Sequence, residues 1–326
     1  MLLFLFYFVV IMIKKHSIKI IRYENQLKNN WNCFVNEAKN GCFLIQRDFM
    51  EYHSDRFSDF SLMFFLDDEL VALLPACKID TVCYSHKGLT YGSLIVKKEC
   101  KFALYKDIFT ALLDFLKDQN FTELIIKTIP LIYCEAGNDE LTFLHQFYEG
   151  SVEMNIGSVI YKTKDVAFSK SVVRNAKNAV KKGIEIKKSN DFKTFWNDLL
   201  LPRLEERFNK KPIHSLDEIM YLKERFPDEI ELYAAFLNNE MIAGTILFNN
   251  KNFVKSQYIA SKSSYNKLGG LDLLHCEIIQ NLKTDYFDFG TSSQDHSTIE
   301  NSSLLAWKEQ FGARTIVFPT YTFNIN

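Results

Sequence analysis

The stretch 61-SLMFFLDDELVALLPA-76 decides the fold, because a second stretch, 230-IELYAAFLNNEMIAGTILF-248, repeats its pattern. Each consists of an apolar run, a short polar turn and another apolar run, which predicts a β-hairpin. At an offset of 171 residues, FLDDELVA lies on FLNNEMIA. The identical pairs are Phe65 and Phe236, Leu66 and Leu237, Glu69 and Glu240, and Ala72 and Ala243. The chain therefore contains a candidate internal repeat.

The same kinds of element follow both hairpins. After the first we expect a strand near 89–96, an amphipathic helix over 102–119 and a buried strand over 123–129. After the second we expect a strand over 253–261, a helix over 268–282 and a strand over 285–290, then a helix over 298–312 and a strand over 315–321. This order predicts two copies of one α/β (α+β) unit, each a mixed, largely antiparallel sheet flanked by helices.

Composition narrows the class of protein. With 326 residues, 47% of them hydrophobic, the chain is long enough for two domains with sizeable cores. A net charge of -1 argues against a protein that mainly coats nucleic acid. Seven cysteines without a CxxC pair predict reduced thiols, a cytoplasmic location and no metal site.

The N-terminus, 1-MLLFLFYFVVIMI-13, is an unbroken apolar run. As a helix it would reach about 20 Å, short of the roughly 30 Å hydrocarbon core of a bilayer. It has neither a basic leading region nor a small-residue cleavage site, which argues against a secretory signal. Three interpretations stay open: an upstream extension with Met12 as the true start, which we favour, a membrane-surface anchor, or a buried strand.

Cations without acids fill the segment 169-SKSVVRNAKNAVKKG-183. Ser169 is a natural N-cap and Gly183 a natural stop, which predicts a helix between them. Its cations, Lys170, Arg174, Lys177 and Lys181, follow one another at steps of four, three and four and so share one face. Like charges at these spacings repel by roughly 0.2 to 0.5 kcal/mol per pair. The face is either solvated or a docking surface for a phosphate-bearing partner.

These elements, with VVRNAKNAVKKGIEI, YFDFGTSS and LLAWKEQFGA, resemble the tandem acyltransferase-fold proteins of the FemAB type in the GNAT (acyl-CoA N-acyltransferase) superfamily. YSHKGLTYGSLIV is also similar to the first-copy segment of GNAT proteins from surface-sugar gene clusters. The resemblance runs from about residue 18 onward. It implies an apolar extension over 1–17, a first GNAT-like domain over 18–163 and a second over 164–326 that carries the active site.

The resemblance implies a cofactor site at 265-YNKLGGLDLL-274, where a loop enters a helix and backbone N–H groups favour a pyrophosphate. Gly270 matches the last glycine of the R/Q-x-x-G-x-G/A pattern, while Leu268 stands where the first is expected. Candidate contacts to acetyl-CoA or another acyl-CoA are Asn266, Lys267, Gly269 and Gly270. The alternative is an ordinary glycine turn, and FemAB members that use aminoacyl-tRNA also lack a clean loop of this kind.

Acyl transfer to an amine needs a side chain that takes the ammonium proton. Candidate catalytic residues are Asp288, which alternates with phenylalanines, and His296 in the polar loop that follows. Lys308 occupies the lysine of the family-like WKxxFG, which the resemblance places near the substrate, where a cation could stabilise an oxyanion. The alternatives are a solvent-facing or loop-bonding aspartate, a surface histidine and a solvated helix lysine.

The resemblance also places the basic helix near the acceptor, so Arg174 and Lys177 are the candidate acceptor-phosphate contacts. We expect a cytoplasmic N-acyltransferase that acts on a small-molecule or lipid-linked amino sugar in polysaccharide or cell-wall synthesis. It would use acyl-CoA as co-substrate, need no metal or DNA, and allow peripheral membrane contact. Two alternatives stay open: an aminoacyl-tRNA-dependent FemAB-type transferase, and a non-catalytic binding protein of the same fold.

Overall fold

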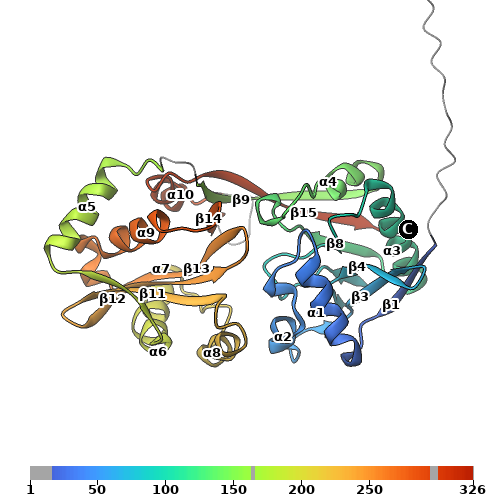
Figure 1. The fold of residues 1–326 in the computed structure, drawn as a ribbon, viewed down its shortest axis with the longest axis horizontal. Helices are drawn as coiled ribbons and strands as arrows, with labels where there is room; N and C mark the ends of the chain where they lie inside the picture. Colours follow the sequence, from blue (N-terminus) through green and yellow to red (C-terminus); the bar gives the residue numbers. More distant parts are fainter. Residues whose placement is uncertain (1–16, 163–165, 294–299, 326) are drawn as a thin grey trace, which may run out of the picture.

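The chain folds into two halves that lie side by side, as Figure 1 shows. The computed structural model describes residues 17–162, 166–293 and 300–325. The apolar stretch over 1–13 and the candidate His296 lie outside these described residues. Two long strands, β9 (Gly150–Tyr161) and β15 (Arg314–Asn324), run between the halves.

A matching β-hairpin stands at the centre of each half, as the repeat predicts. The strands are β3 (Leu62–Leu66) and β4 (Glu69–Leu74) in the first half, and β11 (Ile230–Leu237) and β12 (Glu240–Asn249) in the second. The turn residues all have positive φ: 49° and 64° at Asp67 and Asp68, and 52° and 64° at Asn238 and Asn239. Two such residues in a row form the turn whose twist suits a hairpin, and Asn and Asp tolerate this conformation well.

The two hairpins also share an irregularity. The pairing register shifts between Phe64 and Phe65 in the first hairpin and between Ala235 and Phe236 in the second. These positions coincide at the same offset of 171 residues that aligns the sequences. A local irregularity in the same place supports the inferred duplication, because bulges are specific features of a strand pair.

The remaining elements are as follows. The first half contains β1 (Ile18–Arg22), α1 (Lys28–Glu37), α2 (Arg47–Met50), β2 (Ser58–Asp59), β5 (Cys77–Ile79), β6 (Val82–Tyr84), β7 (Ile95–Val96), α3 (Phe102–Asp118), β8 (Glu123–Lys127) and α4 (Glu140–Leu144). The second contains α5 (Lys170–Lys181), β10 (Glu185–Ser189), α6 (Phe192–Thr194), α7 (Leu201–Phe208), α8 (Leu216–Arg225), β13 (Phe253–Ser261), α9 (Gly270–Gln280), β14 (Tyr286–Thr291) and α10 (Ser302–Glu309). Of the strand predicted near 89–96, only β7 forms, paired with β4.

A continuous sheet joins the halves. In the described part of the chain, eleven strands follow the order β10-β11-β12-β13-β14-β9-β15-β8-β6-β5-β2, and a separate sheet of four has the order β1-β3-β4-β7. The pairs β13–β14 and β6–β8 are parallel, and the other pairs are antiparallel. The predicted mixed, largely antiparallel sheet is thus confirmed.

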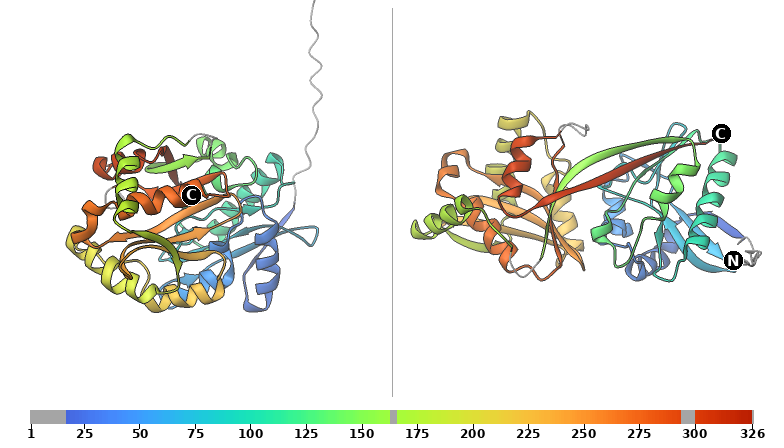
Figure 2. Two further views of the ribbon diagram at one scale, coloured as in Figure 1. Left: turned by 60° about the vertical axis from the view of Figure 1, so that its left-hand side comes forward. Right: turned by 90° about the horizontal axis from the view of Figure 1, so that it is seen from above.

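The halves exchange strands. The last strand of the first half, β9, pairs with β14 of the second, and the last strand of the chain, β15, pairs with β8 of the first. Figure 2 shows β9 and β15 crossing from one half to the other beside each other. Tyr321 and Phe323 of β15 are buried in the core under α3. Residues from beyond the predicted boundary at 163 and 164 therefore complete the first half.

In the second half, helices cover both faces of the sheet. α5 and α9 pack on one face, and α6, α7 and α8 lie on the other (Figure 1). α5 begins as predicted, because the Ser169 hydroxyl accepts a hydrogen bond from the Val172 amide at 3.3 Å. It ends as predicted at Gly183, whose φ of 79° suits a residue without a side chain.

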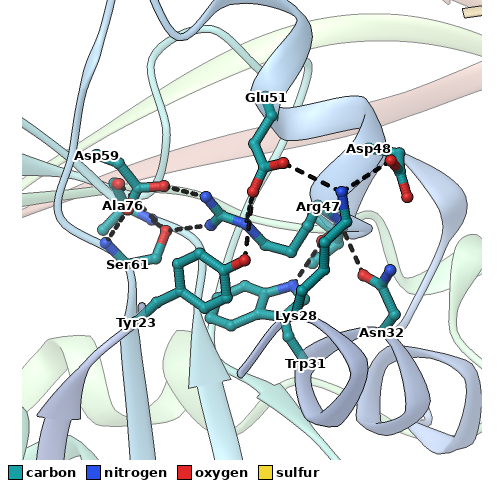
Figure 3. Close-up of polar contacts among 11 residues, drawn as sticks. Tyr23, Lys28, Trp31, Asn32, Arg47, Asp48, Glu51, Asp59, Ser61 and Ala76 are labelled. Carbon is teal, nitrogen blue, oxygen red and sulfur yellow. Dashed lines mark hydrogen bonds and ion pairs between the residues drawn. The ribbon is translucent and has the colours of Figure 1, made fainter. Parts of the chain in front are cut away.

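One buried arginine connects several segments of the first half through hydrogen bonds. Figure 3 shows Arg47 of α2 donating to Glu51 at 3.0 Å, to the Ser61 hydroxyl at 3.1 Å and to Asp59. Its guanidinium carbon lies 3.7 Å from the centre of the Tyr23 ring. This network lines a cavity of about 310 Å³, but its charges are already paired with one another. The arrangement is therefore best explained as structural.

The strand exchange predicts that β15 stabilises the first half. Phe323 is fully buried, with its ring centre 4.9 Å from that of Phe109 on α3. We expect Phe323→Ala to lower the free energy of unfolding by about 3 to 5 kcal/mol and to speed amide exchange in α3. Val317→Ala, at an exposed position of the same strand, should change it by less than about 0.5 kcal/mol. Urea unfolding with hydrogen exchange measures both, and unchanged exchange in α3 would contradict the shared core.

Replacing Arg47 should destabilise the first half and change its response to acid. Arg47→Met removes hydrogen bonds from a buried guanidinium to Glu51, Ser61 and Asp59, which should cost about 1.5 to 3 kcal/mol, whereas Arg56→Met, at the exposed ion pair with Glu218, should cost under about 1 kcal/mol. Burial alone would raise the pKa of Asp59, but Arg47 and the Ser61 amide hold that pKa below its usual value.

This pKa shift sets the sign of the pH dependence. The stabilisation from Asp59 is full above its unfolded pKa of about 3.9 and is lost as pH falls through the lower folded value. Urea unfolding from pH 7 into this acid range should therefore show a steeper loss in the wild type than in Arg47→Met. Parallel acid profiles for the two proteins would argue against this account.

Candidate active site

The second half has an opening in its sheet where two parallel strands diverge. β13 and β14 pair over three residues each, ending at Lys255 opposite Asp288. Both strands continue beyond this point without further pairing to each other, β13 to Ser261 and β14 to Thr291. Ligand sites in α/β sheets commonly form beyond the ends of parallel strands that separate in this way.

Asp288 lies at this opening and is held from both halves. Its side chain is 1% exposed. One carboxylate oxygen accepts from the Gly290 amide at 2.6 Å, and the other accepts from the hydroxyl of Tyr133 in the first half. The Tyr133 ring stacks on Phe253 of β13, with centres 3.5 Å apart and planes 6° from parallel. The carboxylate points inward and accepts from an amide of its own strand, while its catalytic role stays a prediction.

Tyr133 keeps its proton in this environment. Burial, and then the charge of Asp288, raise the pKa of its phenol well above the usual value. The neutral hydroxyl is therefore a donor to the carboxylate. The sequence analysis missed this residue, because its position in the loop after β8 gives no sign of a contact with a strand 155 residues further along the chain.

Lys308 on α10 is buried, so it is not a solvated helix lysine. Its ammonium donates to the carbonyls of Gly290 and Thr291 at 3.0 and 2.6 Å and to the Ser292 hydroxyl at 3.0 Å. These contacts use all three of its protons and hold the segment after Asp288 in place. Burial lowers the pKa of Lys308 to about 8, although the charge of Asp288 acts in the opposite direction.

Lys255 is a second buried lysine, and the sequence analysis did not single it out. It lies opposite Asp288 in register, and its side chain is 8% exposed. Burial lowers the pKa of its ammonium, with the charge of Asp288 opposing this effect. In FVKSQYIAS its position is typical of a solvent-facing residue in a strand whose side chains alternate between the two faces. The signal available in the sequence was a lysine next to Val254 within a predicted strand, and that signal does not indicate burial.

A polar cavity of about 620 Å³ lies between the halves where β13 and β14 begin, and Asp288 is not among its lining residues. Cys134, next to Tyr133, and Tyr286, two residues before Asp288, are among its lining residues. It is bounded by an ion pair across the seam, in which Lys251 of the second half lies 3.1 Å from Glu135 of the first. We call the contact between the halves, where Tyr133 meets Asp288 and Glu135 meets Lys251, the seam.

The predicted cofactor turn is well formed, but its backbone is covered. Gly269 has a φ of 80°, and a Cβ there would lie 2.6 Å from the backbone oxygen of Asn175 on α5. A Cβ on Gly270 would lie 3.2 Å from Ile242. Both glycines thus allow close packing of α9 against its neighbours. Asn266 accepts a hydrogen bond from Ser261 at 2.7 Å, and Lys267 is exposed.

An acidic residue occupies the first turn of α9. Asp272 accepts a hydrogen bond from the Asn175 amide group at 2.8 Å. A carboxylate at a helix N-terminus takes up part of the favourable field that a pyrophosphate would use. Acyl-CoA binding at this turn stays a prediction, and these contacts weigh against it.

The basic face of α5 is exposed and lies near the glycine turn that precedes α9. Arg174 and Lys177 are exposed, and α5 packs against α9 and the turn before it. Figure 1 places α5 at the end of the second half that is remote from the first half. The structure therefore groups Arg174 and Lys177 with the glycine turn and does not bring them to Asp288 and Lys308. Their role as acceptor contacts stays a prediction.

The described residues contain neither a cluster that could hold a metal ion nor a helix that could cross a membrane. Within them, no group of three or more His, Cys, Asp and Glu side chains is arranged to hold a metal ion. None of the helices in the same part of the chain combines the length and the apolar character that crossing a bilayer requires.

Comparisons with known proteins identify the fold. No protein-family model and no curated protein sequence matches the chain. Among solved structures, FemX matches with a TM-score of 0.69 at 12% identity, covering 94% of this chain and 98% of FemX. L-PGS from Bacillus licheniformis matches with a TM-score of 0.58 at 11% identity, covering 90% of each chain.

A further match is the C-terminal domain of a putative lysylphosphatidylglycerol synthetase from Agrobacterium fabrum, with a TM-score of 0.56, 9% identity and 92% of each chain covered. At sequence identities this low, a structural match shows only that the fold is shared. The chain has the FemAB-like tandem GNAT fold, as its sequence predicts.

Proposed function

We propose that this protein is an acyltransferase whose acceptor and donor meet at the seam beside Asp288. The observation that carries the proposal is a buried carboxylate held by Tyr133 and the Gly290 amide, with two buried lysines next to it. Structural neighbours named FemX and lysylphosphatidylglycerol synthetase support a transferase of this kind.

The proposed reaction is direct attack of an acceptor nucleophile on an ester or thioester carbonyl. Asp288 takes the proton that the nucleophile loses, and the Tyr133 hydroxyl fixes the orientation of the carboxylate. The positive charges of Lys255 and Lys308 stabilise the negative charge that develops on the carbonyl oxygen. The donor's leaving group departs as the tetrahedral intermediate collapses, so no covalent acyl-enzyme is needed.

The acceptor we propose is an amine of a sugar-nucleotide, cell-wall or polysaccharide precursor, modified in the cytoplasm. The seam cavity supports a polar acceptor, since residues of both halves line it, among them Glu135 and Lys251. A lipid-linked acceptor is compatible with the lysylphosphatidylglycerol synthetases, whose name specifies a lipid product.

Two acyl donors are candidates, and the contacts around the glycine turn favour one of them. Acyl-CoA is the donor that the glycine turn at 269–270 suggested. However, α5 covers Gly269, and Asp272 already occupies the first turn of α9. This favours the second candidate, an aminoacyl ester carried by tRNA, because such a donor does not need a pyrophosphate site at α9. The exposed cations of α5 are compatible with a polyanionic donor.

Ligand-dependent unfolding distinguishes the donors. A ligand at a hundred times its dissociation constant stabilises a protein by about 2.7 kcal/mol, which raises the unfolding midpoint by several degrees. We expect no such rise with acetyl-CoA. A rise in the wild type that is lost in Lys267→Met, at the exposed lysine of the turn, would restore acyl-CoA as the donor. Gly270 is unsuitable for this test because it packs on Ile242.

Removal of the proposed base should slow transfer without unfolding the protein. We expect Asp288→Asn to reduce the single-turnover rate by about 10² to 10⁴, and Tyr133→Phe to reduce it less, because the carboxylate remains. Asp228→Asn, at an exposed position, is the matched control. Rates are measured by mass of the acylated acceptor, and folding is checked by circular dichroism. Unchanged transfer by folded Asp288→Asn would remove Asp288 from the mechanism.

A further inference from the structure

Three buried histidines lie in one run of aromatic rings that crosses from the second half to the first. His214, just before α8, stacks on Tyr52 with ring centres 5.3 Å apart, and Tyr52 stacks on His53 at 4.2 Å. The His53 ring lies 5.2 Å from that of His86, in the loop after β6. All three histidines are at most 6% exposed. Figure 1 shows the region that they connect, where α8 faces α2.

Two of these histidines have ring nitrogens without a hydrogen-bond partner. Among the described residues, nothing bonds either ring nitrogen of His53 or Nδ1 of His86. The backbone of Gly88 also closes off His53, because a Cβ at Gly88 would lie 2.0 Å from its Nε2. A proton added to either ring would therefore create a buried charge without an acceptor, which is unfavourable.

The third histidine has one partner, which suits its neutral form. Nδ1 of His214 lies 2.6 Å from the hydroxyl of Tyr258 on β13. The hydroxyl oxygen already accepts from the His214 amide at 3.3 Å, so its own proton is available to Nδ1. Nδ1 can accept this proton only while it carries none itself. Protonation of His214 at this nitrogen would thus break the bond.

The charged groups around the three histidines do not supply a free anion. Arg47 lines the same cavity of about 310 Å³ as His53 and His86, and the Arg56 guanidinium lies 5.5 Å from the Tyr52 ring between the other two. The carboxylates beside these arginines are engaged, since Asp59 pairs with Arg47 and Glu218 with Arg56.

The remaining titratable neighbours change this balance little. Burial raises the pKa of Tyr52 to about 12 and also raises the pKa of Tyr258, so both phenols stay neutral. Asp55 is 81% exposed, and Lys87 beside His86 is exposed as well. Glu51 is bonded to Arg47 and Lys28. Positive charge therefore dominates around the buried rings.

These surroundings keep the three rings neutral near neutral pH. Burial lowers the pKa of His53 and of His214 to about 4 and that of His86 to about 3, and neighbouring positive charges act in the same direction. An unfolded histidine has a pKa of about 6.5. The stabilisation from the neutral rings is therefore full above that value and is lost as pH falls from it through the folded values.

We propose that His53, His86 and His214, connected through Tyr52, form a histidine latch that holds α8 against the first half and releases it in mild acid. While the rings are neutral, they pack as apolar surfaces between the halves. Opening gives the imidazoles access to water, where they take up protons, so acid shifts the equilibrium toward the open state. The histidine latch goes beyond acyl transfer and does not depend on it.

The release is local. Phe226, directly after α8, packs on Phe43 and Phe49 of the first half, with ring centres 5.3 and 6.1 Å apart. The β9–β15 ladder joins the halves independently of the histidine latch. These contacts keep the open state a minor population, which amide hydrogen exchange detects.

Hydrogen exchange of the full chain between pH 7 and pH 5 tests the histidine latch, with rates corrected for the intrinsic pH dependence of amide exchange. Opening of peptides from 209–225 should increase about tenfold per pH unit for each histidine that takes up a proton, and so about ten- to a thousandfold between pH 6 and pH 5. Peptides from α3 should not share this increase. Opening of 209–225 that does not change with pH, or an equal increase in α3, would overturn the proposal.

Two variants each remove one titrating ring. His53→Leu is similar in volume and loses no hydrogen bond among the described residues. His86→Asn suits the φ of 62° at this position, because Asn tolerates positive φ. Each should reduce the increase in opening of 209–225 by about tenfold per pH unit. His145→Gln, at a histidine beside Phe323 in the core of the first half, is the control and should keep the full increase.

The wild type also decides the matter without any variant. Titration of its histidine ring protons by NMR should show three midpoints well below 6, and midpoints above pH 6 for the histidine latch would overturn the proposal. An increase in every folded latch variant equal to that of the wild type would do the same. None of these measurements needs a substrate, so their outcome is independent of whether acyl transfer is found.

Discussion

The exchange of β9 and β15 between the halves is the constraint on which the rest of the structure depends. Backbone hydrogen bonds from β14 to β9, from β9 to β15 and from β15 to β8 make one sheet out of two units. A hinge would have to break this ladder, and β15 also contributes to the core of the first half. The seam is thus fixed, so a tyrosine from one half can hold a carboxylate of the other.

The two halves share a repeated strand arrangement but carry different residues where their parallel strands diverge. In the first half, Val82–Tyr84 pair in parallel with Glu123–Ile125, just as β13 pairs with β14. Tyr84 stands opposite Ile125 where the second half has Lys255 opposite Asp288. The first half therefore has no carboxylate at its diverging strands. It contributes Tyr133 to the seam instead, so the two halves supply different parts of the candidate site.

Buried charge distinguishes the seam from the Arg47 network of the first half. Arg47 is surrounded by acceptors that satisfy its guanidinium, and such a closed network stabilises a fold without needing a ligand. At the seam, Lys308 is satisfied in the same way, by two carbonyls and one hydroxyl. Asp288, by contrast, is a buried carboxylate with two buried lysines in the same half, which is the arrangement that the proposed function uses.

The sequence by itself determined the repeat, the hairpin turns, the limits of α5 and the class of fold, because these depend on local patterns. Alternating apolar residues, Asp-Asp and Asn-Asn turns, and a Ser cap act within a few residues of one another. It also marked Asp288 and Lys308, through strand alternation and a family-like motif. Only the tertiary structure decided which of the polar residues are buried together.

The sequence does not distinguish Lys255 from a solvent-facing strand residue, or Tyr133 from an ordinary loop residue. Their burial is visible only once the exchanged strands hold the two halves together. The same packing separated Arg174 and Lys177 from Asp288, although the chain order allowed all of them to meet. Burial and contact across more than a hundred residues depend on how the sheet closes, and no local pattern in the sequence records that.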